Sequence, residues 1–178
     1  MKVKLLLLCV AYSFAATAVT AEPLPPPKVE TAYSRNFKFA ARSDPQTNQT
    51  VVFRQDRPDH PLETLWTFPR WFRVFEVSDD GNAIVAATDE MNSLPLNVPE
   101  TYVLLTFIVK AKIVREITLQ QLFGSRSKLK STPTSLVWGE GLRAIDENGY
   151  AIVDTVVGYF IFEAQTGKCV FPPNNHVN

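Results

Sequence analysis

The segment "TYVLLTFIVK", Thr101–Lys110, constrains the fold of this chain more than any other. Side chains alternate between the two faces of a strand, and here both alternating sets are largely apolar. One set holds Tyr102, Leu104 and Ile108, and the other holds Val103, Leu105, Phe107 and Val109. A strand with two apolar faces requires cover on both, so we expect stacked sheets. Residues 159–162 show the same pattern and predict a second strand of this kind.

Most of the chain has the pattern of β-structure. Short β-branched and aromatic runs are bounded by Asp, Asn, Gly and Pro, which is typical of strands joined by turns. The predicted strands are Phe37–Arg42, Gln49–Arg54, Glu63–Phe68, Arg73–Val77, Ala83–Thr88, Tyr102–Lys110, Ile113–Ile117, Leu142–Ile145, Tyr150–Thr155, Tyr159–Glu163 and Lys168–Phe171. The predicted class is all-β: antiparallel meanders packed as two or three twisted sheets, in a sandwich or an open partial propeller.

One helical turn interrupts the strands. Thr118 and Gln121 have capping-box spacing, and Gly124 can take the left-handed conformation that closes a helix. Leu119, Leu122 and Phe123 share one face, so this turn is expected to pack against the sheets.

Three segments follow a common plan. They are "YSRNFKFAARSD", "VSDDGNAIVAATD" and "IDENGYAIVDT", each a polar turn followed by an apolar strand. A second and a third apolar strand follow each of them, so three strand meanders account for most of the chain.

Two of these segments resemble blades of β-propeller proteins with tryptophan-aspartate-like repeats. The resemblance rests on "FEVSDDGNAIVAATD" and on "LRAIDENGYAIVDTVVGYFIFEAQTGKCV". The wider layout is similar to a group of exported bacterial proteins of unknown function. It includes "LWTFPRWFRVFEVSDDG", "LPLNVPETYVLLTF", "REITLQQL" and "LVWGEGLRAIDENG". The resemblance implies blade-like sheets and export, and it supplies no active site. Three copies are fewer than the roughly four blades of a closed propeller.

The beginning of the chain predicts export. Lys2 and Lys4 precede the apolar stretch Leu5–Ala16, and small residues lead up to Ala21. This is the pattern of a secretory signal peptide, residues 1–21, cleaved after Ala21. A proline-rich spacer over residues 22–27, a domain over 28–172 and a flexible tail over 173–178 complete the expected organisation. The protein is therefore expected in the periplasm or the medium, without membrane insertion after cleavage.

The two cysteines fall on either side of the predicted cleavage site. Lipidation of Cys9 is disfavoured because Leu8 occupies a position that needs a small residue. Cys169 would then be alone in the mature chain, which excludes an intramolecular disulfide. We expect it to be a small buried apolar residue; its thiol would be reactive only if exposed beside Lys168.

The clustered acids are interpreted as turn residues. Asp79-Asp80-Gly81-Asn82 and Asp146-Glu147-Asn148-Gly149 contain the residue types that hairpin turns use, and they lack the spacing of a calcium loop. Asp89 and Glu90 are better acidic candidates because they end a predicted strand before a long loop.

No cofactor or metal site is expected. His60 lies in a proline-rich loop and His176 in the tail, and the chain has neither a Gly-x-Ser-x-Gly turn nor a phosphate-binding glycine loop. The formal net charge of zero gives no reason to expect nucleic acid or an anionic membrane as a partner.

Aromatic side chains supply the best binding candidates. Trp, Phe and Arg are frequent in interface hot spots and sugar-stacking surfaces. Core packing is nevertheless the favoured role of these aromatics, because a domain of this size needs large buried anchors and Trp66 falls in a predicted strand. The loop Glu90–Glu100 adds leucines between prolines. The candidate binding residues are Trp66, Arg70, Trp71, Phe72, Leu94, Leu96 and Trp138.

These features favour a non-catalytic binding or structural module of the bacterial cell envelope. Its expected partner is an envelope protein or a glycan, and its expected state is a monomer or a small closed oligomer. The alternative is a small periplasmic hydrolase that uses carboxylates such as Asp89 and Glu90.

Overall fold

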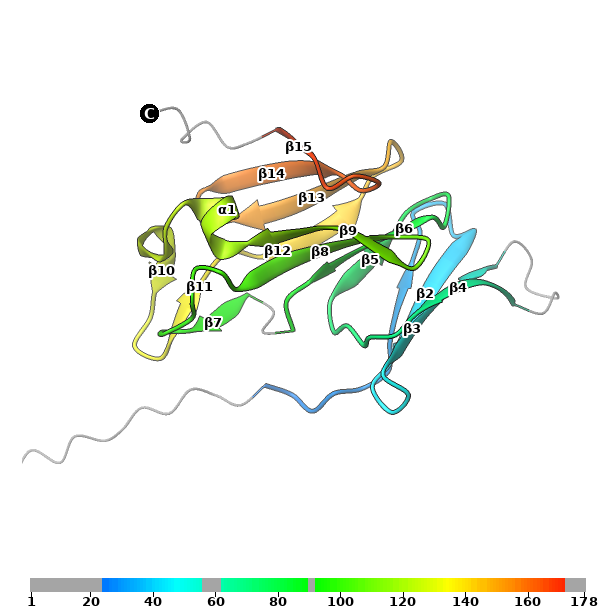
Figure 1. Ribbon diagram of the computed structural model, residues 1–178, viewed down its shortest axis with the longest axis horizontal. Helices are drawn as coiled ribbons and strands as arrows, with labels where there is room; N and C mark the ends of the chain where they lie inside the picture. Colours follow the sequence, from blue (N-terminus) through cyan, green and yellow to red (C-terminus); the bar gives the residue numbers. More distant parts are fainter. Residues whose placement is uncertain (1–23, 56–61, 90–91, 172–178) are drawn as a thin grey trace, which may run out of the picture.

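A computed structural model describes residues 24–55, 62–89 and 92–171, and it confirms the all-β class. Three four-stranded antiparallel sheets follow one another along the chain (Figure 1). The N-terminal sheet contains β1 (Glu30–Tyr33), β2 (Phe39–Asp44), β3 (Gln49–Arg54) and β4 (Glu63–Phe68). The middle sheet contains β5 (Phe75–Val77), β6 (Ala83–Ala87), β8 (Val103–Val109) and β9 (Lys112–Thr118). The C-terminal sheet contains β12 (Gly141–Ile145), β13 (Tyr150–Thr155), β14 (Gly158–Glu163) and β15 (Cys169–Phe171).

A small fourth sheet was not predicted. It pairs β10 (Lys130–Ser131) with β11 (Ser135–Val137), and β11 with β7 (Ser93–Pro95). These strands are short, and β7 contains a proline, so their sequences carry little strand signal. Strand β1 is also short and was not predicted. It adds a fourth strand to the first predicted meander. The segment Glu90–Glu100, expected to be a loop, therefore contains a strand.

The strand predicted to begin at Phe37 begins at Phe39 instead. Phe37 lies in the β1–β2 turn with a positive φ of 57° and a largely exposed side chain. A positive φ is incompatible with strand pairing, so the apolar character of Phe37 misplaced the boundary.

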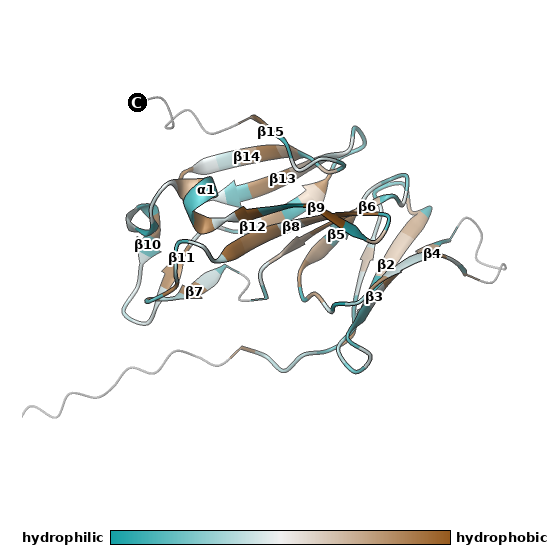
Figure 2. Ribbon diagram, viewed as in Figure 1, coloured by the Kyte–Doolittle hydropathy of each residue, from teal (hydrophilic) through white to brown (hydrophobic). Residues whose placement is uncertain are grey.

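The middle sheet is covered on both faces. One cluster joins it to the N-terminal sheet and includes Phe39, Val52, Phe72, Ile84 and Ile108. A second cluster joins it to the C-terminal sheet and includes Val85, Leu105, Phe107, Val153 and Phe162. Hydrophobic residues follow β8 through the centre of the molecule, whereas the turns are hydrophilic (Figure 2). The prediction that β8 is apolar on two covered faces is thus confirmed.

The corresponding prediction for residues 159–162 is wrong. Phe160 and Phe162 are buried, but Tyr159 on the opposite face is 55% exposed. The C-terminal sheet is an outer layer, so its strand β14 buries mainly one face.

The predicted helical turn is α1 (Leu119–Phe123), followed by the 3₁₀ turn η1 (Arg126–Lys128). Gln121 N donates to Thr118 Oγ1, and Thr118 N donates to Gln121 Oε1 at 2.9 Å, which completes the capping box. Gly124 has a φ of 77°, and Leu119, Leu122 and Phe123 are buried. Each local prediction for this turn is confirmed.

The hairpin turns that follow β1, β5 and β12 are linked to one another or to the neighbouring sheet. Asn36 N donates to Asp79 Oδ1 at 2.8 Å, and Arg35 forms an ion pair with Glu147 at 2.6 Å. Gln165, after β14, donates to Asp80 Oδ2 at 3.0 Å. These contacts join all three large sheets.

Several predictions fall on residues that the structure does not describe: the signal peptide 1–21, His60, Glu90, and the tail 173–178 with His176. In the described ranges, no helix is both long and apolar enough to cross a membrane.

Candidate functional site

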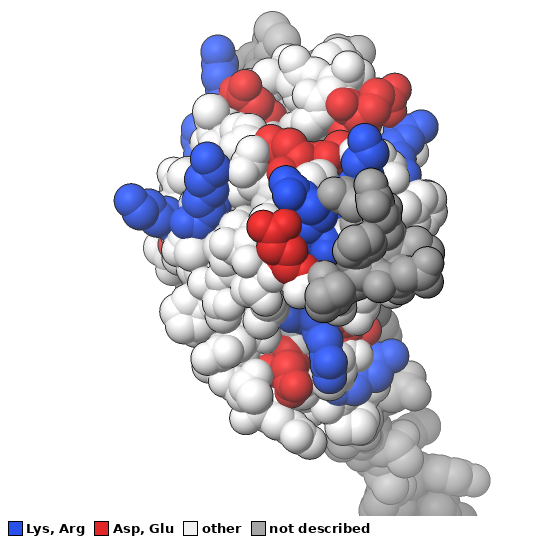
Figure 3. All heavy atoms as spheres, turned by 90° about the vertical axis from the view of Figure 1, so that its right-hand side faces the viewer, with Lys and Arg blue, Asp and Glu red and all other residues white. Residues whose placement is uncertain are grey.

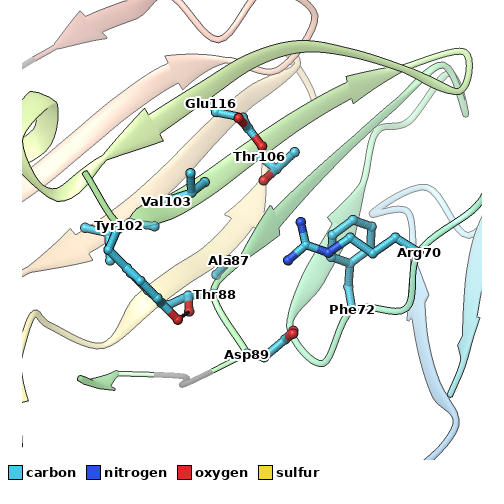
Figure 4. Close-up of a pocket in the computed structure, with 10 residues that line it drawn as sticks. Arg70, Phe72, Ala87, Thr88, Asp89, Tyr102, Val103, Thr106 and Glu116 are labelled. Carbon is cyan, nitrogen blue, oxygen red and sulfur yellow. Dashed lines mark hydrogen bonds between the residues drawn. The ribbon is translucent and has the colours of Figure 1, made fainter. Parts of the chain in front are cut away.

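A hollow of about 240 Å³ lies between the middle sheet and the segment that leads into it from β4 (Figure 4). It brings together Arg70 and Asp89, two residues predicted as candidates on separate grounds. The full lining is Arg70, Phe72, Ala87, Thr88, Asp89, Tyr102, Val103, Leu104, Thr106 and Glu116.

Regular structure positions most of this lining. Thr106 on β8 and Glu116 on β9 are cross-strand partners. Asp89 lies two residues beyond the end of β6, and Tyr102 immediately precedes β8. Because β6 and β8 pair with each other, the ends of these strands meet at the same edge of the hollow.

Arg70 is the exposed cation of the site, and its backbone is held firmly. Its N donates to Phe68 O at 2.9 Å, and its carbonyl accepts from Thr50 Oγ1 at 2.7 Å. The guanidinium lies 5.1 Å from the centre of the Phe72 ring, a cation–π distance. Phe72 is 1% exposed and serves as a buried support, which corrects its prediction as a surface contact.

The remaining polar groups surround this guanidinium. Figure 4 shows Arg70 directed into the hollow, with Asp89 on one side and Thr106 and Glu116 on the other. Asp89 Oδ1 accepts from Arg73 N at 3.4 Å, and the Thr88 and Tyr102 hydroxyls lie 2.7 Å apart. The hollow therefore presents a cation, two carboxylates and several hydroxyls in a small space.

Trp71 lies next to Arg70 in the chain and contacts the N-terminal segment that precedes β1. Its indole Nε1 donates to Lys28 O at 3.1 Å. The Arg73 guanidinium lies 5.2 Å from the Trp71 ring and donates to Pro25 O at 2.8 Å. Trp71 is half-buried, so part of the surface predicted to receive a partner is occupied by Lys28 and by Pro25 of the predicted spacer.

Three other predicted binding residues serve the fold. Trp138 is fully buried and Leu94 is 1% exposed, because both belong to the larger core cluster beneath the small sheet. Trp66 is half-buried and donates from Nε1 to Gly81 O at 2.8 Å. Leu96 is 46% exposed and remains available at the surface.

The turn acids form the hydrogen bonds expected of turns. Asp80 accepts from Ser78 Oγ at 2.6 Å and from Asn82 N at 2.9 Å. Burial acts to raise the pKa of Asp80, but these hydrogen bonds outweigh it and lower the pKa below its ordinary value. Asp79 has an additional role that the sequence did not indicate, because it accepts from Asn36 of the neighbouring sheet.

Cys169 is a half-buried free thiol. Burial raises its pKa, which a backbone hydrogen bond and Arg115 oppose only in part. The reactive-thiol alternative therefore gains no support. Within the described ranges, no cluster of three or more His, Cys, Asp or Glu residues could hold a metal ion.

Sequence reasoning missed Thr88, Tyr102, Thr106 and Glu116 as members of the site. One signal was present: Thr106 is the polar residue within the otherwise apolar strand "VLLTFIV".

Comparison with known proteins found no matching family model and no matching curated protein.

A second carboxyl group of interest lies on β5. Burial raises the pKa of Glu76 from its ordinary value of 4.5 to about 7. The folded state therefore holds more protons than the unfolded state between these pH values, and stability falls as pH rises through this window.

The variant Glu76→Gln removes this titration. We expect it to raise the free energy of unfolding by about 2–3 kcal/mol at pH 8.5 and to leave it nearly unchanged at pH 4. Urea unfolding at the two pH values measures the effect. Glu63→Gln, at an exposed position on β4, is the control. Equal changes in the free energy of unfolding for both variants at both pH values would contradict the raised pKa of Glu76.

Proposed function

We propose that this protein is an exported, non-catalytic binding module of the bacterial cell envelope, and that the Arg70 hollow recognises a glycan. The observation that carries the proposal is the convergence of Arg70, Asp89, Glu116 and hydroxyl groups on one hollow. Sugars present many hydroxyls, each a donor and an acceptor, and such a mixed polar lining matches them.

The size of the hollow suits a small part of a ligand. At about 240 Å³ it lies somewhat below the range of roughly 300–1,000 Å³ usual for drug-sized ligands. We infer that one sugar unit of a longer glycan occupies it. On the face at the right-hand side of Figure 1, Lys and Arg lie beside Asp and Glu, so that face offers no extended field of one sign (Figure 3).

The test is calorimetric titration with purified bacterial envelope oligosaccharides. For an oligosaccharide that binds, Arg70→Ala should reduce affinity by roughly ten-fold or more, because hydrogen bonds to a charged group contribute about 1.5–3 kcal/mol. Arg54→Ala is the matched control, since Arg54 also lies over a buried phenylalanine, with its guanidinium 5.8 Å from the Phe39 ring. Equal affinity losses in both variants, or no binding by the wild type, would argue against a glycan site here.

A hydrolase is the second candidate, because Asp89 and Glu116 line the same hollow. Paired carboxylates can serve as acid and base in glycoside hydrolysis. Release of new reducing ends from the bound oligosaccharide, abolished by either Asp89→Asn or Glu116→Gln, would favour the enzyme over the binding module.

The propeller-like arrangement also belongs to this proposal. The first strand of the middle meander, β5, contacts β1 of the N-terminal meander and β12 of the C-terminal meander. The innermost strands of propeller blades lie around a common channel, so contacts among these first strands support an open, three-bladed arrangement.

A further inference from the structure

A second hollow, of about 320 Å³, lies where the first strands of the three large sheets meet. Each sheet supplies two residues of its lining. They are Tyr33 and Arg35 from β1 and its turn, Glu76 and Val77 from β5, and Ala144 and Ile145 from β12. The Arg70 hollow shares none of these residues.

The walls of this hollow are held in place by the linked turns. Asn36 makes two hydrogen bonds to Asp79, each 2.8 Å long, which connect the turns after β1 and β5. The pair of Arg35 and Glu147 joins the turn after β1 to the turn after β12. A preformed cavity of this kind needs little rearrangement to bind a ligand.

Glu76 is the unsatisfied charge in this hollow. Within the described part of the chain its carboxylate makes no hydrogen bond and no ion pair, and burial raises its pKa to about 7. Arg35 does not neutralise it, since its guanidinium pairs with Glu147. On β6, the residue opposite Glu76 is the apolar Val85, and β2, also packed against β5, contributes nothing to the lining.

The residues that line the hollow indicate which class of ligand it can bind. A partly buried carboxylate without a partner is best satisfied by a cation. The chain offers no set of three metal ligands within its described ranges, which argues against a metal ion. Tyr33 is 51% exposed at the same hollow and can place its ring against an organic cation.

We propose that this hollow binds a primary ammonium group, as carried by a lysine side chain or a free alkylamine, through the Glu76 carboxylate and the Tyr33 ring. The bound ammonium donates hydrogen bonds to the carboxylate, and its alkyl chain rests on Val77, Ala144 and Ile145. Ligand binding favours ionised Glu76, so affinity rises with pH through neutrality.

Two-dimensional NMR titration of the full chain tests the proposal, with Nα-acetyl-lysine methylamide as the probe. Saturable shifts are expected for residues around Glu76, with affinity roughly ten-fold or more higher at pH 8.5 than at pH 5.5. The amine of the probe stays charged at both values. Nα-acetyl-norleucine methylamide, which lacks the ammonium, should not bind. Butylamine binding with equal affinity would assign the site to free amines, and weaker butylamine binding would assign it to lysine side chains.

Variants separate this site from the fold and from the Arg70 hollow. Glu76→Gln should reduce lysine-probe affinity at pH 8.5 by roughly ten-fold or more, and Tyr33→Leu by several-fold. Tyr33→Phe, Glu63→Gln and Arg70→Ala should leave it unchanged. The proposal is overturned by unchanged affinity in Glu76→Gln, by equal binding of the norleucine probe, or by the absence of saturable shifts at pH 8.5.

Discussion

Replacing Trp138 with alanine is expected to lower the free energy of unfolding by about 3–5 kcal/mol. Trp138 is fully buried in the larger core cluster, so removal of its ring leaves a cavity in the core. Its backbone also links distant segments, since its N donates to Asn92 O and its carbonyl accepts from Val156 N. Urea unfolding of the purified variant measures the loss.

Trp71→Ala is the matched control for this prediction. The same side chain is deleted, but Trp71 is only half-buried, so less packing is lost. We expect a clearly smaller loss of stability in this variant. Losses of equal size would mean that burial at position 138 contributes less than the structure indicates.

Gly81→Val is expected to lower the free energy of unfolding by roughly 3 kcal/mol. Gly81 has a φ of 67°, which costs a residue with a side chain roughly 1–2 kcal/mol. A Cβ at this position would also lie 2.4 Å from Cδ1 of the buried Phe39 ring. Overpacking of that kind adds about 1–3 kcal/mol.

The variant Gly149→Val separates the cost of the positive φ from the cost of overlap with the Phe39 ring. Gly149 also has a positive φ, 81°, but a Cβ added there would meet no atom within 4 Å beyond its chain neighbours. In thermal unfolding, Gly149→Val should therefore lower the melting temperature only by the backbone cost. Gly81→Val should lower the melting temperature further. Equal shifts would mean that the Phe39 ring moves aside at little cost.

Features that depend on nearby residues were predictable from the sequence. The two apolar faces of Val103–Val109, the capping box of Thr118 and Gln121, and the turn bonding of Asp80 each follow from the chemistry of neighbouring residues. These local preferences are found in the folded protein because tertiary packing favours the same conformations.

The candidate site was only partly predictable. Arg70 and Asp89 stood out by composition and position, whereas Thr106 and Glu116 joined them only because β8 pairs with β9. Trp138 and Leu94 looked like surface candidates because their flanking residues resemble loops, yet both lie in the core.

The order of residues was enough to predict the all-β class, the three meanders and the chemistry of their turns, because strand alternation and turn propensity act over a few residues. Which side chains share a hollow, and which carboxylate lacks a partner, emerged only from the packing of the sheets. Glu76 shows the reason: its pKa depends on burial created by strands far apart in the chain, β1 and β12, that meet β5 only in the folded protein.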